Sequence, residues 1–409
     1  RFRKKQGIYY YRPTEEKFQV KILMLTPYLP YPDSSGGQIR TQNLLKHLCK
    51  DHEITLLSLI KDPKENENIK YLLKYCKKVF TFQRSPTPWT LKNILKTGFS
   101  LDPFLIVRNY APGIREAVAK ELETGKYDLI HAETFYVMPS IPKTNLPIIL
   151  VDQTIEYLVY QHYVNETAPW FLRPLLQIDV EKTKYAERYY WRQANQVVAV
   201  SEADRKEMLK LEPEIDIKVV QNGVNLDLFK KKTRWDTKEK VIMQLSNFRW
   251  LQNIEAAEML IKEVFPLVQK KIKNIKLWIV GQHIPTAISD MATKGVIIKD
   301  FPPEDAESLT LCLQNASVFA STIKGPGGSR LKNLAAMASQ LPIVSTRVGV
   351  EGLDVENRKH ILIGNSPQKI ADLIVRVLKS PRLAKRLAIA TRQHVEEHFD
   401  WRIIARKLG

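Results

Sequence analysis

The fold is decided by residues 317–339, which read SVFASTIKGPGGSRLKNLAAMAS. The short run Ser317 to Ala320 predicts a buried strand, and Leu334 to Ser339 has a helical pattern. The glycines between them allow backbone N–H groups to approach a ligand closely. A strand, a glycine loop and a helix in this order are typical of open α/β sheets, whose ligands bind where a strand ends and the next helix begins.

The loop in this stretch combines glycines with a hydroxyl and two cations. Gly327, Gly328 and Ser329 precede Arg330 and Lys332 at the start of the helix. Backbone donors, the helix dipole and fixed positive charge together form a cradle for phosphate oxygens. The loop is neither a Walker loop, which needs GxxxxGK followed by Ser or Thr, nor a complete GxGxxG fingerprint. A phosphate-binding loop outside those two classes is predicted, with a solvated glycine loop as the alternative.

The same alternation of short strands and helical patterns runs along most of the chain, which predicts parallel sheets covered by helices. Two sets of strands are separated by a charged, turn-like stretch at Lys230 to Asp236. We therefore expect two doubly wound, Rossmann-like domains of the α/β class. The strands are expected at Val20 to Thr26, Glu53 to Ile60, Lys78 to Phe82, Tyr127 to His131, Pro147 to Val151 and Gln196 to Val200, and then at Val241 to Leu245, Ile275 to Val280, Val296 to Ile298, Ser317 to Ala320, Ile343 to Ser345 and His360 to Ile363.

This pattern divides the chain into four parts. They are a basic arm (1–19), an N-terminal domain (20–213), a C-terminal domain (214–385) and a helical segment (386–409) that could pack back on the N-terminal domain. The strand-like stretch Asp216 to Val224 could join either sheet, which leaves the domain boundary open by about twenty residues.

Composition is that of an ordinary globular protein, apart from its charge. In 409 residues, 44% are hydrophobic and 26% charged, which excludes disordered, collagen-like and disulfide-scaffold chains. The 63 Lys and Arg against 44 Asp and Glu give a net charge of +19, which favours a polyanion or an anionic membrane as partner. The three cysteines are far apart, as in a reducing compartment, and no apolar run approaches the roughly 20 residues of a membrane span. We expect a cytoplasmic protein, with a peripheral position on the inner face of the membrane as an option.

Several segments, in the right order, resemble the glycosyl transferases group 1 (glycosyltransferase family 4), which are retaining enzymes of the GT-B fold. The strongest match runs from Gly327 to Ser339 and continues through Leu341 to Thr346 and Gly349 to Leu353. The other matching segments are Thr26 to Tyr28, Ser35 to Gly37 with Arg40, Val197 to Asp204, Asn222 to Asn225, Asn247 to Asn253 and Ile279 to Gly281.

The resemblance implies transfer of a hexose from a UDP- or GDP-linked sugar to a glycan or lipid-linked acceptor, with retention of the anomeric configuration. The two domains would face each other across a cleft, and the C-terminal one would hold the donor. Family members usually need no metal, and the sequence has no Asp-x-Asp triplet. No cofactor or metal site is therefore expected, and protein groups must neutralise the leaving diphosphate.

The residues that the resemblance assigns to donor and diphosphate follow from these matches. Arg330 and Lys332 are expected to act catalytically on the diphosphate, with Arg249 as a third cation. Where relatives usually carry a Glu that binds ribose, this chain has Ala335, at a cost of about 1.5–3 kcal/mol in hydrogen bonding. The expected donor-binding residues are Gly36, Gly37, Arg249, Asn253, Gly327, Gly328, Ser329, Ala335 and Glu351, the last with a solvated loop carboxylate as the alternative.

Acceptor residues are expected at the strand ends of the N-terminal domain. His131 ends an apolar strand and Glu133 follows it, so either could orient an acceptor hydroxyl or take its proton. A purely structural histidine is the alternative. Asp152 and Glu156 follow the next strand and are expected to contact the acceptor.

Membrane contact has two candidate segments outside these motifs. Trp89 to Phe99 mixes aromatic, aliphatic and basic residues, as interfacial segments do, although we favour a core-facing helix with its lysines in water. The arm Arg1 to Lys5 could bind anionic headgroups or remain flexible.

A retaining GT-B glycosyltransferase is therefore the predicted function, with a nucleotide sugar and a glycan or lipid-linked acceptor as partners. The substitution at Ala335 leaves a weakened or inactive protein that binds sugar nucleotides or glycans as the first alternative. A basic nucleic-acid-binding protein is the second, but only the charge supports it, because no nucleic-acid motif is present.

Overall fold

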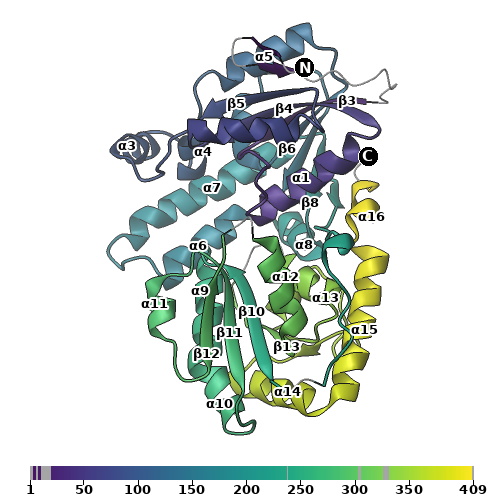
Figure 1. The fold of residues 1–409 in the computed structure, drawn as a ribbon. Coiled ribbons are helices and arrows are strands. Elements are labelled where there is room, and N and C mark those ends of the chain that lie inside the picture. Colours follow the sequence, from purple (N-terminus) through teal and green to yellow (C-terminus); the bar gives the residue numbers. More distant parts are fainter. Residues whose placement is uncertain are drawn as a thin grey trace. The chain divides into compact units, whose positions relative to one another are not determined.

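The computed structural model describes residues 3–5, 8–10, 20–236, 238–302, 305–325 and 331–407, without the side chains of 3–5, 8–10 and 306. Two compact units form, and the first gives way to the second between Val220 and Gln221 (Figure 1). The expected boundary at 213 is corrected to this later position, because Ile217–Val219 pairs as a parallel strand in the first sheet.

The first unit is built on one sheet whose strand order, in the described residues, is β1-β2-β5-β4-β3-β6-β7-β8-β9. The strands from β5 to β9 in this order are parallel, while β1 and β2 add to one edge in antiparallel fashion. The segment 1–19, expected as a separate arm, thus contributes two strands to this sheet. The strands are β1 (Arg3–Lys5), β2 (Ile8–Tyr10), β3 (Val20–Thr26), β4 (His52–Ile60), β5 (Lys78–Gln83), β6 (Leu129–Glu133), β7 (Ile148–Asp152), β8 (Gln196–Ala199) and β9 (Ile217–Val219).

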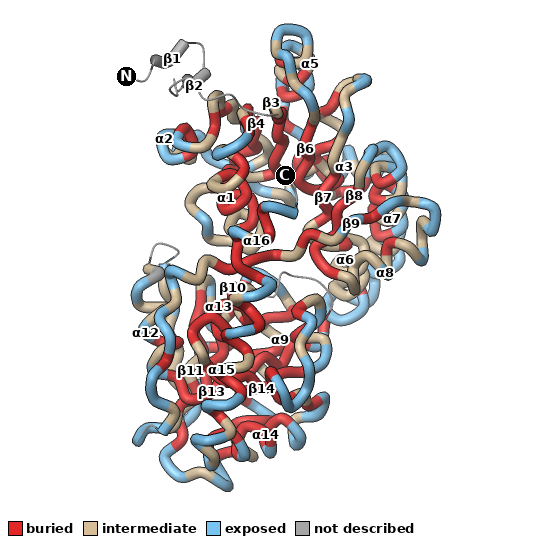
Figure 2. The backbone as a smooth tube through the Cα atoms, turned by 90° about the vertical axis from the view of Figure 1, so that its right-hand side faces the viewer, coloured by how far each residue is buried: buried red, intermediate tan, exposed pale blue. Residues whose placement is uncertain are grey.

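Helices cover this sheet on both faces, as the nearly continuous burial of β3 and β4 requires. The helices are α1 (Gly36–Leu48), α2 (Ile69–Leu72), α3 (Leu91–Phe99), α4 (Phe104–Asn109), α5 (Ile114–Thr124), α6 (Glu156–Glu166), α7 (Arg173–Gln193) and α8 (Glu202–Leu211). In Figure 2 the strands β3 and β4 are red along most of their length, while α5 and α8 show much blue or tan.

The second unit contains a parallel sheet with the order β12-β11-β10-β13-β14-β15 in the described residues. This is the doubly wound order of a dinucleotide-binding fold. Alternate residues of β10 enter opposite cores, because Ile242 packs on one face while Val241 and Met243 pack on the other. The strands are β10 (Val241–Asn247), β11 (Lys276–Gln282), β12 (Val296–Asp300), β13 (Val318–Ser321), β14 (Ile343–Ser345) and β15 (Leu362–Ile363).

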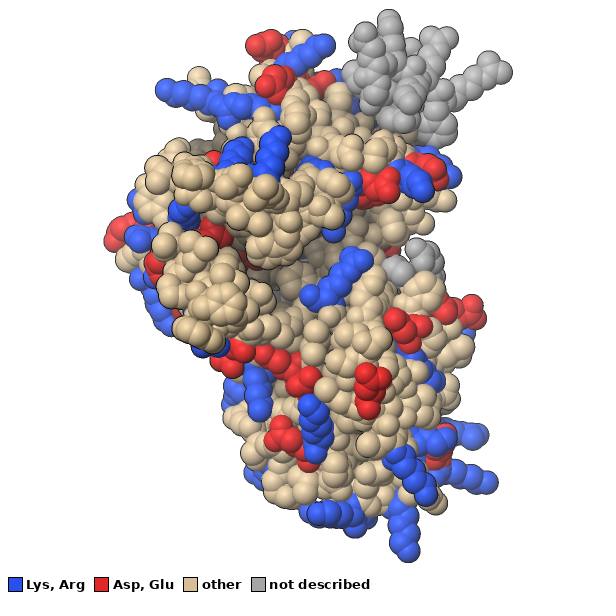
Figure 3. Space-filling model, turned by 90° about the vertical axis from the view of Figure 1, so that its left-hand side faces the viewer, with Lys and Arg blue, Asp and Glu red and all other residues tan. Residues whose placement is uncertain are grey.

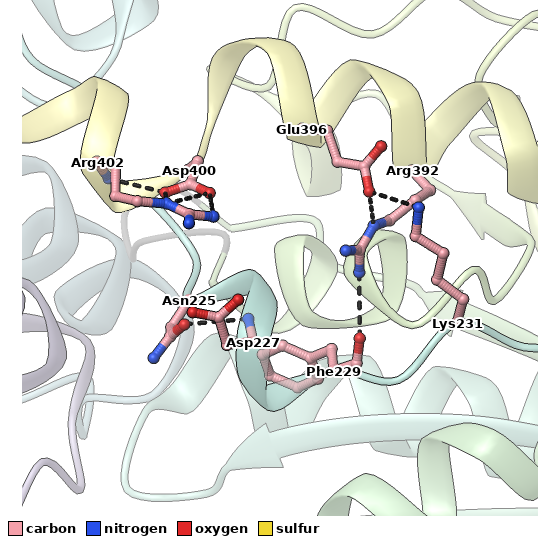
Figure 4. Close-up of polar contacts among 8 residues, drawn as sticks. All are labelled: Asn225, Asp227, Phe229, Lys231, Arg392, Glu396, Asp400 and Arg402. Atoms are coloured by element: carbon pink, nitrogen blue, oxygen red, sulfur yellow. Dashed lines mark hydrogen bonds and ion pairs between the residues drawn. The ribbon is translucent and has the colours of Figure 1, made fainter.

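The C-terminal helices belong to this second unit. Arg392 donates to the carbonyl oxygens of Phe229 (3.2 Å) and Ala338, and its Nε lies 2.7 Å from Glu396, which also pairs with Lys231 (Figure 4). The expected C-terminal segment from 386 is therefore corrected to a helix that begins at Pro381, and the chain from there to Arg406 belongs to the second unit. The helices here are α9 (Leu251–Met259), α10 (Phe265–Gln269), α11 (Thr286–Asp290), α12 (Ala306–Asn315), α13 (Leu331–Ala338), α14 (Pro367–Lys379), α15 (Pro381–His398) and α16 (Trp401–Ala405).

Helix α3 corrects the interpretation of Trp89 to Phe99 as a core-facing helix. Its buried side is polar, with Asn93 only 8% exposed and bonded to the carbonyl oxygen of Pro88 at 2.9 Å. Thr97 sits one turn later and donates to the carbonyl oxygen of Asn93. The apolar residues of the helix point away from the core instead.

Candidate functional site

Each sheet has one point at which the strand order reverses, and each such point carries polar side chains. In the first sheet it lies between β3 and β6, and in the second between β10 and β13. Ligands of open α/β sheets bind outside the carboxyl ends of the strands at this switch point. The chain therefore has two candidate sites, one in each unit, and each is described by itself.

The first site is organised by a buried histidine–carboxylate pair. His131 and Glu133 are two residues apart on β6, so their side chains point to the same face of the sheet. His131 Nε2 lies 2.9 Å from Glu133 Oε1. Both side chains are buried. The structure thus brings together the two residues expected on the acceptor side.

Gln153 and Tyr28 extend this pair into a network. Gln153 Nε2 donates to Glu133 Oε2 and, at 2.9 Å, to the hydroxyl of Tyr28, which in turn lies 3.1 Å from Gln153 Oε1. Gly37, near the start of α1, lies directly over these groups, because a Cβ there would come within 2.1 Å of the Tyr28 hydroxyl. Gly36 is the first residue of the same helix, which Ser35 caps by accepting from the N–H of Gln38.

The carboxylate of Glu133 stays ionised. Burial alone would raise the pKa of Glu133, but the hydrogen bond with His131 and the positive charges at His131 and Arg40 outweigh it and lower that pKa. Arg40 is fully buried and donates to the carbonyl oxygen of Val220 at 2.9 Å. An ionised carboxylate can only accept, so Nε2 of His131 carries a hydrogen, and Nδ1 is the proton acceptor whenever the ring is neutral.

Sequence reasoning missed Gln153, Tyr28 and Arg40 as parts of this site, and it missed the backbone of Thr134. Thr134 has φ of 75°, a conformation that L side chains adopt rarely, immediately after Glu133 at the strand end. Such strain collects at functional sites. Tyr28 and Arg40 could have been found from the sequence, because both lie in segments that resemble the family. No feature of the sequence indicated Gln153 or Thr134.

Asp152 and Glu156, expected to contact the acceptor, lie in a cluster of carboxyl groups with Glu187, of which Asp152 and Glu187 are buried and Glu156 is half-buried. Asp152 ends β7 and accepts from Trp191 Nε1 at 2.6 Å, while Glu187 of α7 accepts from the backbone N–H groups of Glu156 (2.6 Å) and Tyr157 at the start of α6. Burial, with the nearby charge of Glu156, raises the pKa of Asp152 to about 7. Burial also raises the pKa of Glu156 to about 7, against the opposing charge of Arg108. Burial and the charge of Asp152 raise the pKa of Glu187 well above its usual range.

The second site is organised by Lys332. Its Nζ lies 2.5 Å from Asn253 Oδ1 and 3.4 Å from the Ser246 hydroxyl, so α13, α9 and the end of β10 converge there. Asn253 is itself held by a 2.7 Å bond from its Nδ2 to the carbonyl oxygen of Asn247. Two predicted donor residues, Lys332 and Asn253, are thus in direct contact.

Arg249 adds exposed positive charge beside this edge. It follows β10, and its N–H donates to Asn247 Oδ1 at 3.1 Å. Burial and, next, the charge of Arg249 lower the pKa of His283. Gly281 permits the close approach of strands β10 and β11 here, because a Cβ would come within 1.8 Å of the carbonyl oxygen of Ser246.

Polar atoms without a hydrogen-bond partner among the described residues also collect at this edge. They are Oε1 of Gln282, the hydroxyl of Ser321 and Oδ1 of Asn333, all buried. Gln282 ends β11 and Ser321 ends β13, so both belong to the carboxyl side of the sheet. A buried polar atom is normally hydrogen-bonded, so these atoms leave hydrogen-bonding capacity that a polar ligand or water would satisfy.

The remaining predicted donor residues fall in three places. Ala335 is buried in α13 within the core that includes Leu334 and Ala336. Glu351 is exposed in the loop after Val350. Gly327, Gly328, Ser329 and Arg330 lie outside the described residues.

Two family models match the chain. The model of Glycosyltransferase Family 4 matches residues 34–228, and the model of Glycosyl transferases group 1 matches residues 239–380. A relative in Klebsiella pneumoniae, described as an uncharacterized 44.6 kDa protein in the cps region, is 22% identical over 93% of this chain and 96% of its own length.

Solved structures share the architecture. Sucrose-phosphate synthase from Thermosynechococcus elongatus has a TM-score of 0.71 at 18% identity, covering 96% of this chain and 98% of the other. The Anabaena protein HepE in complex with UDP-glucose has a TM-score of 0.64 at 15% identity, covering 95% and 98%. These likenesses confirm the predicted GT-B fold, with two Rossmann-like α/β domains.

Proposed function

Since the chain is a glycosyltransferase with the GT-B fold, as its two family models and its architecture support, we propose that it transfers a hexose from a nucleotide sugar to a glycan or lipid-linked acceptor, with retention and without a catalytic metal. The observation that carries the proposal is the contrast between the two switch points. One holds a histidine with an ionised carboxylate, and the other holds the cations Lys332 and Arg249.

The second unit is proposed to bind the donor. Breaking the bond between the anomeric carbon and the diphosphate leaves negative charge on phosphate oxygens, which Lys332 and Arg249 would stabilise. Arg330 and the glycines of the 325–328 loop would add to this site. A UDP- or GDP-linked sugar is the expected donor, and the solved structure of HepE with UDP-glucose supports the UDP-linked class.

The first unit is proposed to bind the acceptor. As the new bond forms to the anomeric carbon, the acceptor hydroxyl must lose its proton, and Nδ1 of His131 is the available base. Glu133 is a positioning residue, because it fixes the ring through Nε2. Asp152 and Glu156 would act from the adjoining strand end. The Klebsiella relative from a cps region supports a polysaccharide acceptor.

The decisive experiment is a panel of UDP-, GDP- and ADP-sugars tested for binding by thermal shift and for slow hydrolysis. A donor at about 100 times its Kd should stabilise the protein by about 2.7 kcal/mol. The Ala335→Glu variant should bind the same donor about 10-fold more tightly, because it restores an acceptor for ribose hydroxyls. The proposal would be contradicted if neither the unchanged protein nor the Ala335→Glu variant bound or hydrolysed any donor of the panel.

A binding module without turnover is the second candidate, favoured by Ala335, which offers no side-chain acceptor in α13. Donor binding without transfer or hydrolysis, unchanged in the Ala335→Glu variant, would select it.

A further inference from the structure

The side of α3 that faces away from the core is apolar, although it is exposed to solvent. Leu91, Ile94, Leu95 and Phe99 recur at helical spacing and are all exposed, Phe99 by 90%. These positions lie on one side of the helix, opposite the buried Asn93. Leu101, just after the helix, is 91% exposed.

The tip of the hairpin between α6 and α7 has the same character. Trp170 is 80% exposed, Phe171 lies edge-on to it at 6.0 Å, and Leu175 and Ile178 continue the exposed stripe along α7. Tyr185 and Tyr189 carry the stripe farther along the same helix. Spacings of three and four residues keep these side chains on one side of α7.

Lys182 joins the two apolar areas. It lies on the same stripe of α7, and its Nζ donates at 2.8 Å to the carbonyl oxygens of both Thr97 and Ser100 at the end of α3. The ring of Trp89 stacks on Phe104 at 4.4 Å and fixes the other end of α3. We call the combined surface the apolar face, which consists of Trp89, Leu91, Ile94, Leu95, Phe99, Leu101, Trp170, Phe171, Leu175 and Ile178.

The two segments that carry the apolar face are rich in basic residues. Residues 84–101 contain Arg84, Lys92 and Lys96 and no Asp or Glu, and residues 167–178 contain Arg173 and no acidic residue, while the exposed Asp102 and Glu181 lie at the margin of the face. Lys92 and Lys96 flank the apolar side of α3. Figure 3 faces the side from which α3 projects in Figure 1, and both blue and red side chains border its broad tan areas. A second copy of the chain would bring like charges together here, whereas an anionic surface would neutralise them.

We propose that the apolar face is a membrane-binding surface, which inserts its aromatic and aliphatic side chains at the headgroup level of an anionic bilayer. Exposed apolar patches of this kind mark interaction sites, and Trp together with flanking Lys and Arg is the composition of an interfacial segment. The net charge of +19 adds long-range attraction to an anionic surface. In the described part of the chain no helix is long and apolar enough to cross a bilayer.

The test is flotation of the full chain with vesicles of phosphatidylcholine, with and without phosphatidylglycerol. We expect binding to the anionic vesicles, weakened by salt, and a blue shift of tryptophan emission that the Trp170→Phe variant reduces. The double variant Phe99→Ser/Leu101→Ser should lower the partition coefficient at least 10-fold. Both side chains are almost fully exposed, so this variant should keep the Tm of the unchanged protein. The matched control is Leu311→Ser/Ile389→Ser, two exposed apolar residues of the second unit, which should bind as the unchanged protein does.

Three results would overturn the proposal. One is equal partition of the Phe99→Ser/Leu101→Ser variant and the unchanged protein, and another is no binding of the unchanged protein to anionic vesicles. The third is a dimer in sedimentation that the same variant dissolves, since it would assign the face to self-association. Sugar-nucleotide binding, measured without vesicles, should be identical in all variants, so failure of the membrane proposal remains distinct from failure of the proposed function.

Discussion

The two switch points share a topology but carry opposite chemistry. The first, between β3 and β6, has His131, Glu133, Gln153 and Tyr28 in one hydrogen-bonded network with a buried carboxylate at its centre. The second, between β10 and β13, has Lys332 as its central charge, held by Asn253 and Ser246.

This difference teaches how one fold, used twice, can carry two different kinds of site. A hydrogen bond to a buried carboxylate holds one histidine nitrogen in a defined state, as an acid–base group needs. Cations suit a ligand that brings its own negative charge. The fold supplies the position of each site, and the side chains supply its chemistry.

Removal of the central cation of the second site should have the largest effect. Lys332→Met should lower kcat/KM about 100- to 1,000-fold, because the leaving diphosphate loses a preorganised positive charge. Steady-state transfer or donor hydrolysis measures this. The control Lys379→Met removes an exposed lysine of α14 and should leave the rate unchanged. Equal rates for Lys332→Met and Lys379→Met would show that Lys332 is not part of the site.

The two glycines of these sites should respond differently to alanine. Gly281→Ala should cost about 3 kcal/mol of folding free energy, because its Cβ meets the backbone oxygen of Ser246 at 1.8 Å and backbone cannot move aside cheaply. Gly37→Ala should cost about 1 kcal/mol, since its Cβ meets the ends of the Tyr28 and Gln153 side chains, which can shift. Denaturant unfolding compares them, and a reversed order would contradict the packing described for the two edges.

Substitutions in the pair of His131 and Glu133 should have the next largest effect. His131→Gln should lower kcat/KM about 100-fold and remove the acid limb of the pH–rate profile, because no proton acceptor remains. Glu133→Gln keeps an acceptor for Nε2 and should lower the rate less. A His131→Gln variant with an unaltered profile would make His131 a structural residue.

The smallest effect concerns pH and the buried carboxyl cluster of the first unit. The pKa of Asp152 is raised to about 7 in the folded state, so the folded state holds the extra proton and stability falls as pH rises from about 4 to about 7. Asp152→Asn keeps an acceptor for Trp191 and should reduce this fall by about 1 kcal/mol, or roughly 2–4 °C in Tm. Neighbouring Glu156 and Glu187 should retain part of the pH dependence. A steeper fall in the variant would contradict the assignment.

Much of the fold could be predicted because strand and helix periodicity is local. The runs around Val20 and Val241 were identified as strands from their apolar residues alone, and both form the central strands expected of doubly wound sheets. The predictions were weaker where the assignment of a segment depends on pairing between distant parts of the chain. Ile217–Val219 could join either sheet by composition, and only its pairing with β8 assigns it to the first.

Site residues could be predicted where they lie at the end of a strand that the sequence pattern indicates. His131, Glu133 and Lys332 were named from such positions. Gln153 was not, because its contact with Glu133 joins positions twenty residues apart that only the parallel pairing of β6 and β7 brings together.

The sequence by itself determined two doubly wound domains, the polar residues at their strand ends and the excess of positive charge, since these depend on residue type and short-range spacing. Only the tertiary structure decided which way those residues face. The helix at Leu91–Phe99 shows the reason most clearly: its amphipathic pattern is visible in the sequence, but packing placed Asn93 inward and Phe99 in water. Periodicity defines the two sides of a helix, and the rest of the fold determines which of them is buried.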